Sequence, residues 1–365
     1  MPPREPPPHR GPPPPQRRHR LSGNSIAWIV MTLLLLGLGL LAFQGPNERQ
    51  RELAEGYLIF EVQGHRGARG LAPENSLPGF ARALEIGVHT LELDVVMTAD
   101  GTPVVLHDPI LDPTRTRGPD GAWLAGENLA VNALSLEELR RYDIGRIAPG
   151  SRAASRFPEQ QGLDGVAVPT LAEAIAQAEV QSGGAVRYNI ETKISPAQPE
   201  LTPDPNSFAD ALIAVLEEAG VTERATVQSF DWRTLQRVQA AAPELATAYL
   251  TVEQDWMDTV RRGEAGLSPW LAGYDLKQAE GLLPVLVKRA GGDVWSPYFR
   301  DLREVDLRDA HRVGLRVVVW TVNDPADMAS LIELGVDGII TDYPDRLKAV
   351  LADYGLPEPP SYPRR

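Results

Sequence analysis

The sequence predicts an α/β barrel, because short apolar segments alternate with helical patterns along about 300 residues of the chain. Most of these segments are four to six residues long and are bounded by Gly, Pro, Asn or Asp. Strands that alternate with helices favour parallel βα units. Eight such units in a chain of this length predict a TIM barrel. The eight predicted strands are residues 59–63, 90–95, 186–191, 225–229, 246–250, 293–296, 316–320 and 337–341.

The composition excludes several classes of function. The chain has 365 residues, and 43% of them are hydrophobic, so it can bury a large core without the help of disulfides or structural metal ions. It has no cysteine. Disulfides, thiolate metal sites and a cysteine nucleophile are therefore excluded. The net charge is -13, and residues 1–24 carry five arginines and one glutamate, so the remainder carries -17. An acidic body does not bind nucleic acid, although a metal or local cations still permit a small phosphate ester.

The N-terminal part divides into three segments. Residues 1–24 hold nine prolines and little else that is apolar, which predicts a disordered Pro/Arg-rich tail. Residues 25–43, SIAWIVMTLLLLGLGLLAF, carry no charge. As a helix they span about 28 Å at ~1.5 Å per residue, which is close to a hydrocarbon core. They predict a transmembrane anchor, followed by a polar connector at residues 44–56.

A secretory signal is the alternative interpretation of residues 25–43. Signal peptides have a shorter apolar core, and LLAFQG offers no small-x-small cleavage site. Arg17, Arg18 and Arg20 precede the segment, which places the N-terminus in the cytoplasm by the positive-inside rule. The remainder of the chain is therefore expected in the periplasm or outside the cell.

The body is expected at residues 57–353, with a flexible tail at 354–365. Helical patterns cover residues 77–86, 171–181, 208–219 and 326–334. Asp100-Gly101 lies between two apolar arms, so residues 104–106 are predicted to return as a hairpin and not as a ninth barrel strand. Residues 112–168 are predicted to be an insertion after the second strand, with one helix near 136–142. Long insertions of this kind usually lie over the functional site of a barrel.

Three carboxylates are candidate metal ligands. Side chains at i and i+2 of a strand share a face, so Glu92 projects with Asp94, and Glu191 with Lys193. All lie near strand C-termini, where barrel active sites form. Carboxylates that converge there repel one another unless a cation joins them. Oxygen ligands favour Mg²⁺ or Ca²⁺ over zinc.

Two histidines and two cations complete the candidate site. His65 follows the first strand and His107 closes the hairpin. Histidine suits proton transfer near neutral pH, so one could take a proton from the attacking hydroxyl while the other gives one to the leaving oxygen. Arg66 and Lys193 can hold phosphate oxygens. His89 and His311 are interpreted as structural.

Taken in order, these motifs resemble the glycerophosphodiester phosphodiesterase family. The resemblance covers nearly the whole body. The matching segments are GHRGARGLAPENS (64–76), LELDVVMTADGTPVVLHD (91–108), LDPTRTRG (111–118), VPTLAEAI (168–175), NIETK (189–193), VQSF (227–230), VVVWTVND (317–324) and DGIITDYP (337–344).

The resemblance implies a TIM barrel with an inserted segment, divalent metal at Glu92, Asp94 and Glu191, and His65 with His107 as the acid/base pair. It implies that Arg66 and Lys193 hold the phosphate. Three further side chains are expected at the mouth of the site as substrate-binding residues: Gln228, Trp295 and Trp320. Glu74 and Asn75 are expected to shape the first loop, and Asp342 to end the last strand.

The expected function is metal-dependent hydrolysis of a small glycerophosphodiester to glycerol 3-phosphate and an alcohol, a step of lipid and glycerol metabolism. The phosphorus would be attacked by the glycerol 2-hydroxyl, through a cyclic phosphate, or directly by water. A phospholipase of the lysophospholipase D or phospholipase C type, acting on membrane lipid with the same site, is the alternative. A tethered binding module on an inactive barrel is the third possibility, which the full set of site residues argues against. The sequence indicates no protein partner.

Overall fold

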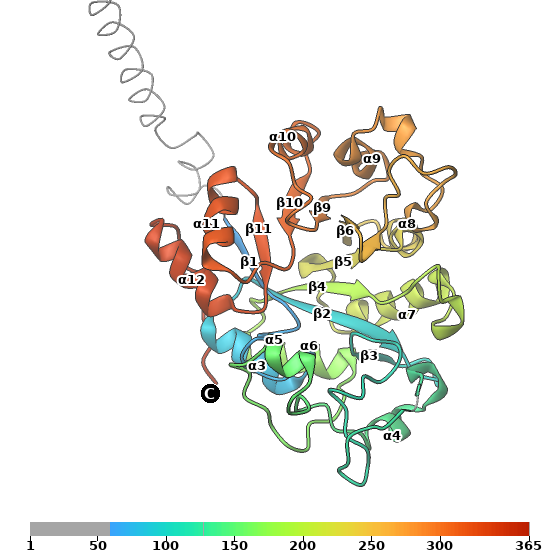
Figure 1. Ribbon diagram of the computed structural model, residues 1–365, viewed down its shortest axis with the longest axis vertical. Helices are drawn as coiled ribbons and strands as arrows, with labels where there is room; N and C mark the ends of the chain where they lie inside the picture. Colours follow the sequence, from blue (N-terminus) through green and yellow to red (C-terminus); the bar gives the residue numbers. More distant parts are fainter. Residues whose placement is uncertain (1–58, 127, 365) are drawn as a thin grey trace, which may run out of the picture. The chain divides into compact units, whose positions relative to one another are not determined.

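A computed structural model describes residues 59–126 and 128–364 (Figure 1). Its main sheet has nine strands, of which eight are parallel and pair in a closed ring, because β1 contacts both β2 and β11. The TIM barrel predicted from the sequence is thus confirmed. The parallel strands are β1 Glu61–Gly64, β2 Thr90–Met97, β4 Arg187–Thr192, β5 Ala225–Ser229, β6 Ala246–Thr251, β9 Val294–Pro297, β10 Arg316–Val319 and β11 Gly338–Thr341.

A helix follows each of these strands, after a hairpin in the cases of β2 and β6, and Figure 1 shows the helices around the outside of the strands. They are α3 Leu77–Ile86, α6 Leu171–Ser182, α7 Pro205–Glu218, α8 Trp232–Ala241, α9 Leu283–Arg289, α10 Glu304–Arg312, α11 Pro325–Leu334 and α12 Pro344–Asp353. Short 3-10 turns cover Val131–Ala133, Pro199–Leu201, Thr222–Arg224, Pro269–Leu271 and Leu276–Ala279.

Local sequence signals fix where the helices begin and end, as α6 illustrates. The Thr170 hydroxyl accepts a hydrogen bond from the Glu173 amide at 3.1 Å, and the Glu173 carboxylate accepts one from the Thr170 amide at 2.9 Å. This capping box satisfies two amides that a helix start leaves unpaired. Gly183 ends the helix at φ 67, a left-handed conformation that glycine adopts without a steric cost.

Alternate residues of each strand face opposite sides of the barrel wall. The outward side chains, such as Leu93, Tyr188 and Val317, join the large core between strands and helices. The inward side chains differ around the ring. From β1, β2, β4 and β5 they are mostly polar and buried: Glu61, Gln63, Thr90, Glu92, Asp94, Asn189, Glu191 and Gln228. From β6 and β9 to β11 they include a small apolar cluster of Ala248, Val294, Val318 and Ile340.

The predicted hairpin is present, since β3 Pro103–Val105 pairs antiparallel with the end of β2. The segment between β3 and α6 contains α4 Leu136–Leu139 and α5 Arg152–Arg156. Together with the β2–β3 hairpin it forms a second, smaller core of Val96, Val104, Leu111, Val131, Leu139, Ile144 and Val168. It also packs on the loop after β1, where the Arg69 guanidinium lies 4.6 Å from the Phe157 ring centroid. A second hairpin, β7 Glu253–Gln254 and β8 Met257–Asp258, follows β6.

The predicted tail, anchor and connector at residues 1–24, 25–43 and 44–56 lie outside the described residues. Within the described part of the chain, no helix combines the length and apolar character needed to cross a membrane. The C-terminal stretch expected to be a flexible tail is partly tied to the barrel. The Tyr362 amide donates to the Leu84 carbonyl at 2.7 Å, and its own carbonyl accepts from Gln181 at 2.8 Å.

Candidate active site

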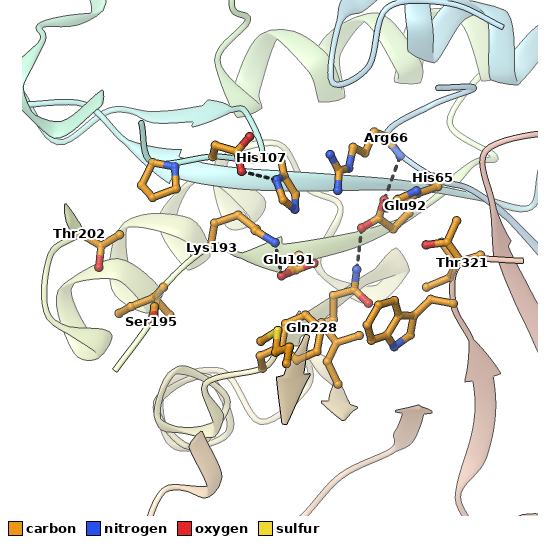
Figure 2. Close-up of a pocket in the computed structure, with 18 of the residues that line it drawn as sticks. His65, Arg66, Glu92, His107, Glu191, Lys193, Ser195, Thr202, Gln228 and Thr321 are labelled. Carbon is orange, nitrogen blue, oxygen red and sulfur yellow. Dashed lines mark hydrogen bonds and ion pairs between the residues drawn. The ribbon is translucent and has the colours of Figure 1, made fainter. Parts of the chain in front are cut away.

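A cavity of about 370 Å³ opens at the C-terminal end of the barrel strands. His65, Arg66, Glu92, His107, Glu191, Lys193, Gln228 and Trp320 all line it, although they come from six different strands or the loops that follow them. Figure 2 shows His107, Arg66 and His65 on one side of the carboxylates and Gln228 on the other. Asp94 lies directly behind this lining and is fully buried.

The three predicted metal-ligating carboxylates converge. Glu92 and Asp94 lie on β2, and the strand register places Asp94 beside Glu191 on β4. One oxygen from each of the three groups lies within 4.8 Å of the others. Their side chains are 1%, 0% and 10% exposed, so water screens their mutual repulsion little.

This crowding shifts the pKa values of the three carboxyl groups in different directions. Burial raises the pKa of Glu92 well above its usual range, and the charges of Asp94 and Glu191 raise it further. Burial likewise raises the pKa of Glu191 to about 7, although Lys193 opposes this shift. Burial also acts to raise the pKa of Asp94, but Arg66, His107 and Lys193 hold it well below its usual range. Asp94 is therefore the permanently ionised member of the cluster.

The cluster fits a divalent cation. Asp94 Oδ1 is buried and accepts no hydrogen bond, and its other oxygen already accepts one from Asn75 Nδ2 at 2.8 Å. A buried carboxylate oxygen without a donor is costly unless a cation is its partner. An all-oxygen donor set of three carboxylates suits a hard ion such as Mg²⁺ or Ca²⁺.

Arg66 and Lys193 are the cations nearest to the carboxylates. The Arg66 amide donates to Glu92 Oε2 at 2.9 Å, while its guanidinium contacts Glu74 Oε1 at 2.9 Å and Asp94 Oδ2 at 3.0 Å. Lys193 Nζ lies 2.6 Å from Glu191 Oε1 and 3.8 Å from Asp94 Oδ1. The Arg66 backbone has φ 50, an uncommon value for a residue other than glycine.

His65 is oriented by a carboxylate from the other end of the chain. Its Nδ1 lies 2.6 Å from Asp342 Oδ1. Asp342 also accepts hydrogen bonds from Arg69 at 2.7 and 3.0 Å and from Asn323 at 2.7 Å. Burial, reinforced by the Arg69 charge, lowers the pKa of His65 to about 4. The ring is therefore neutral at pH 7 and its Nε2, 3.9 Å from Glu92 Oε2, is a free base.

His107 has the same kind of partner. Its Nδ1 lies 2.7 Å from Asp108 Oδ1, and burial together with Arg66 and Lys193 lowers its pKa. A carboxylate on Nδ1 fixes the tautomer and stabilises the imidazolium that forms when Nε2 takes a proton. The site thus offers two imidazoles on one cavity wall, each with its Nδ1 occupied.

The structure does not place Trp295 in the cavity, where the sequence predicts it. The side chain is 2% exposed and faces outward from β9, where its Nε1 donates to Thr251 Oγ1 at 2.9 Å. Its neighbours Val294 and Ser296 take the inward positions, because strand side chains alternate. Trp320, which follows β10, does line the cavity, as predicted.

Gln228 contacts a carboxylate as well as the cavity. Its Nε2 donates to Glu92 Oε1 at 2.7 Å, and its Oε1 accepts from Asn189 Nδ2 at 3.0 Å. The same Asn189 nitrogen donates to Gln63 Oε1 at 2.7 Å, and Gln63 donates to Glu61 at 3.1 Å. A hydrogen-bonded chain therefore crosses the polar half of the barrel interior and ends on Glu92.

Several of these supporting residues were not predicted as part of the site. Asp342 was expected to end the last strand, yet it holds His65, because ring closure places β11 beside β1. Asn189 and Gln63 carried a usable signal, since Asn189 precedes Glu191 by two positions and so shares its face of β4. Arg69 carried none, because its partner Asp342 is 273 positions away in the sequence.

Comparison with known proteins gives one family. The model of the glycerophosphoryl diester phosphodiesterase family matches residues 65–346, more than half of the chain. A glycerophosphodiester phosphodiesterase from Caldanaerobacter subterraneus subsp. tengcongensis is 29% identical over 296 residues, which cover 78% of this chain and 95% of that protein.

Solved structures agree. A protein from Silicibacter pomeroyi DSS-3 that carries the same family name is 37% identical, with a TM-score of 0.73, over 82% of this chain and 95% of that one. A phosphodiesterase from Oleispira antarctica, solved with its product sn-glycerol-3-phosphate, is 23% identical with a TM-score of 0.59, over 82% and 99% of the two chains. The latter likeness shows the shared fold.

The carboxylate cluster predicts a pH-dependent stability in EDTA. The pKa of Glu191, about 7 in the folded protein against an ordinary 4.5, is raised. Its contribution to stability is therefore complete below pH 4.5 and is lost as the pH rises through about 7. Glu191→Gln cannot ionise, so we expect it to unfold at a higher temperature than the wild type at pH 7.5, with the difference shrinking toward pH 4.5. Thermal unfolding followed by circular dichroism measures this.

Glu217→Gln provides the matched control, because Glu217 is an exposed glutamate on α7. It should show the pH dependence of the wild type. If Glu191→Gln and the wild type unfolded at the same temperature across this pH range, the proposed repulsion would be wrong.

Proposed function

The chain belongs to the glycerophosphoryl diester phosphodiesterase family, and from that premise we propose that it hydrolyses glycerophosphodiesters to glycerol 3-phosphate and an alcohol. It is an enzyme of the phosphoric diester hydrolase class. One observation carries the assignment of roles: three carboxylates, two cations and two carboxylate-bound histidines meet at a single cavity.

We propose that Glu92, Asp94 and Glu191 hold the divalent cation, as Mg²⁺ or Ca²⁺. When bound, the cation would withdraw electron density from the phosphodiester and neutralise part of the charge that develops in the transition state. Arg66 and Lys193 would bind the phosphate oxygens beside it, Arg66 through its planar fork and Lys193 as a point charge. Gln228 and Asn75 would keep the carboxylates in position through their hydrogen bonds to Glu92 and Asp94.

The two histidines would move the protons. The Nε2 of one ring would take the proton from the attacking oxygen, which belongs to water or to the glycerol 2-hydroxyl. The other ring, protonated, would give a proton to the leaving alcohol oxygen. Asp108 and Asp342 support both roles, because each carboxylate stabilises the positive charge of its imidazolium. A phospholipase would use the same groups at phosphorus and would differ in preferring intact lipid to soluble deacylated substrates.

We expect His65→Ala and His107→Ala each to lower kcat by about 10² to 10⁴, because each removes a general acid or base. Glycerol 3-phosphate release from glycerophosphocholine, with folding checked by circular dichroism, measures this. His311→Gln is the control, since its ring lies on α10 against Asp337 and should not affect turnover. Near-normal turnover in both alanine variants would contradict the assignment.

The hydrogen-bonded chain behind Glu92 should govern cation affinity. Asn189→Leu leaves the side-chain Oε1 atoms of Gln228 and Gln63 without their shared donor. Gln228 is then no longer held in place, so its hydrogen bond no longer fixes the orientation of Glu92. Loss of such supporting bonds typically costs about 10- to 100-fold in metal affinity. We expect that loss when Mg²⁺ or Ca²⁺ is titrated calorimetrically into EDTA-stripped protein.

Thr247→Val is the matched control for this titration. It also replaces a fully buried polar side chain, but the Thr247 hydroxyl bonds to Gln239 and has no link to Glu92. Its cation affinity should equal that of the wild type. Equal affinity in Asn189→Leu would refute the supporting role of the chain.

We further propose that residues 25–43 anchor the protein in a membrane with the body on the periplasmic or extracellular side. The uncharged 19-residue stretch and the preceding arginines support this. Protease added outside an intact cytoplasmic membrane, after any outer membrane has been opened, should then digest the body. Digestion only after the cytoplasmic side is opened would contradict the proposed orientation.

A further inference from the structure

The residues that line the active-site cavity are largely charged up to Lys193 and uncharged after it. Among the described residues that line it, every charged or histidine side chain lies at or before Lys193: His65, Arg66, Arg69, Glu92, His107, Asp108, Arg156, Glu191 and Lys193. None of the lining residues after Lys193 is charged, and most are apolar: Ile194, Leu201, Phe230, Leu250, Trp256, Met257, Trp270, Trp320 and Ile340. We call this second set the apolar wall.

The apolar wall packs against the apolar side of the barrel interior. Trp320 packs against the apolar barrel cluster of Ala248, Val294, Val318 and Ile340. Its indole Nε1 donates to the Ser296 carbonyl at 2.9 Å, so the polar edge of the ring is already satisfied. The remaining ring surface is therefore suited to apolar contact.

Aromatic packing extends this wall outward to the rim. Ring centroids lie 5.3 Å apart for Phe230 and Trp320, 5.4 Å for Tyr298 and Trp320, and 6.5 Å for Trp256 and Trp320. Trp256 lies in the turn between β7 and β8 and is 60% exposed. Because Trp256 is continuous with the other rings, it extends a contiguous apolar surface, and such a surface beside a cavity is a usual mark of a binding site.

The chemistry of the wall selects a class of ligand. A charged head group placed there would lose its hydration without gaining an oppositely charged partner. A hydrocarbon arm would gain the full benefit of leaving water. Aromatic faces can also hold a cationic ammonium group, but aliphatic side chains such as Leu201 and Leu250 interrupt them and offer a cation no attraction.

We propose that the apolar wall is a subsite for a hydrocarbon arm of the phosphodiester substrate. This rests on the proposed function, because the phosphate must be bound beside the carboxylate cluster and Lys193 for an arm to reach the wall. The arm is carried either by the alcohol or, as an acyl chain, by the glycerol. Both share one chemistry, an uncharged chain of methylenes.

The test uses the full-length enzyme with its divalent cation and a series of glycerophosphodiesters of n-alkanols from ethanol to octanol. Glycerophosphocholine, glycerophosphoglycerol and lysophosphatidylcholine below its micelle concentration complete the set. We expect kcat/KM to rise by roughly two- to fourfold for each added methylene until the wall is filled. A steeper gain in the alkanol series or with lysophosphatidylcholine identifies which ester bears the arm.

Trp256→Ala should flatten the dependence of kcat/KM on chain length, because it removes the outer part of the wall. Trp256→Glu should flatten it further, since a carboxylate repels hydrocarbon and favours a cationic head group. Trp256 is exposed, so neither change disturbs the core. Trp123→Ala makes the same change at an indole that does not line the cavity, and it should keep the wild-type dependence.

The experiment distinguishes a failure of the hydrocarbon subsite from a failure of the proposed function. Hydrolysis of glycerophosphoglycerol with no dependence on chain length, or with glycerophosphocholine as the best substrate, would overturn the hydrocarbon subsite and leave the proposed function intact. Equal chain-length dependence in Trp256→Ala and the wild type would also overturn it. If no member of the set were hydrolysed, the proposed function and this inference would fall together.

Discussion

The repulsion among Glu92, Asp94 and Glu191 is the constraint on which the rest of the site depends. Three buried carboxylates with oxygens within 4.8 Å of one another are unstable without compensation. Arg66 and Lys193 compensate part of the charge and keep Asp94 ionised. Burial raises the pKa of Glu92 and Glu191, so the cluster readily takes up a proton or a cation. Its supporting residues hold the oxygens together against this repulsion, and they account for the polar inward faces of β1, β2, β4 and β5.

The barrel interior therefore serves two purposes. Its polar half, from β1 to β5, holds charges that a dry core would reject. Its apolar half, from β6 to β11, packs as an ordinary core and continues into the uncharged wall of the cavity. Both halves belong to one closed sheet, so their arrangement around the cavity is fixed by strand order.

The sequence was sufficient for the architecture and for selecting most of the side chains that the fold brings together at one cavity. The strand at 225–229 has the bounds that were predicted, because alternation and flanking turns mark a strand locally. Glu92 and Asp94 could be paired from their spacing alone. Trp295 could not be placed, because the direction of a strand side chain depends on register, and a shift of one residue exchanges the two faces. The partners of His65 were equally out of reach, since Asp342 lies 277 positions away.

That separation has a consequence for how the site forms. His107 takes its carboxylate from the next residue, Asp108, so this pair can form as soon as the hairpin does. His65 and Arg69 depend on Asp342, which reaches them only when β11 pairs with β1 and closes the ring. A barrel that lacked its last strand would retain all three clustered carboxylates, both histidines and both cations. It would still leave His65 unoriented and Arg69 buried without its main partner. Closure of the sheet is thus a condition of the chemistry as well as of the fold.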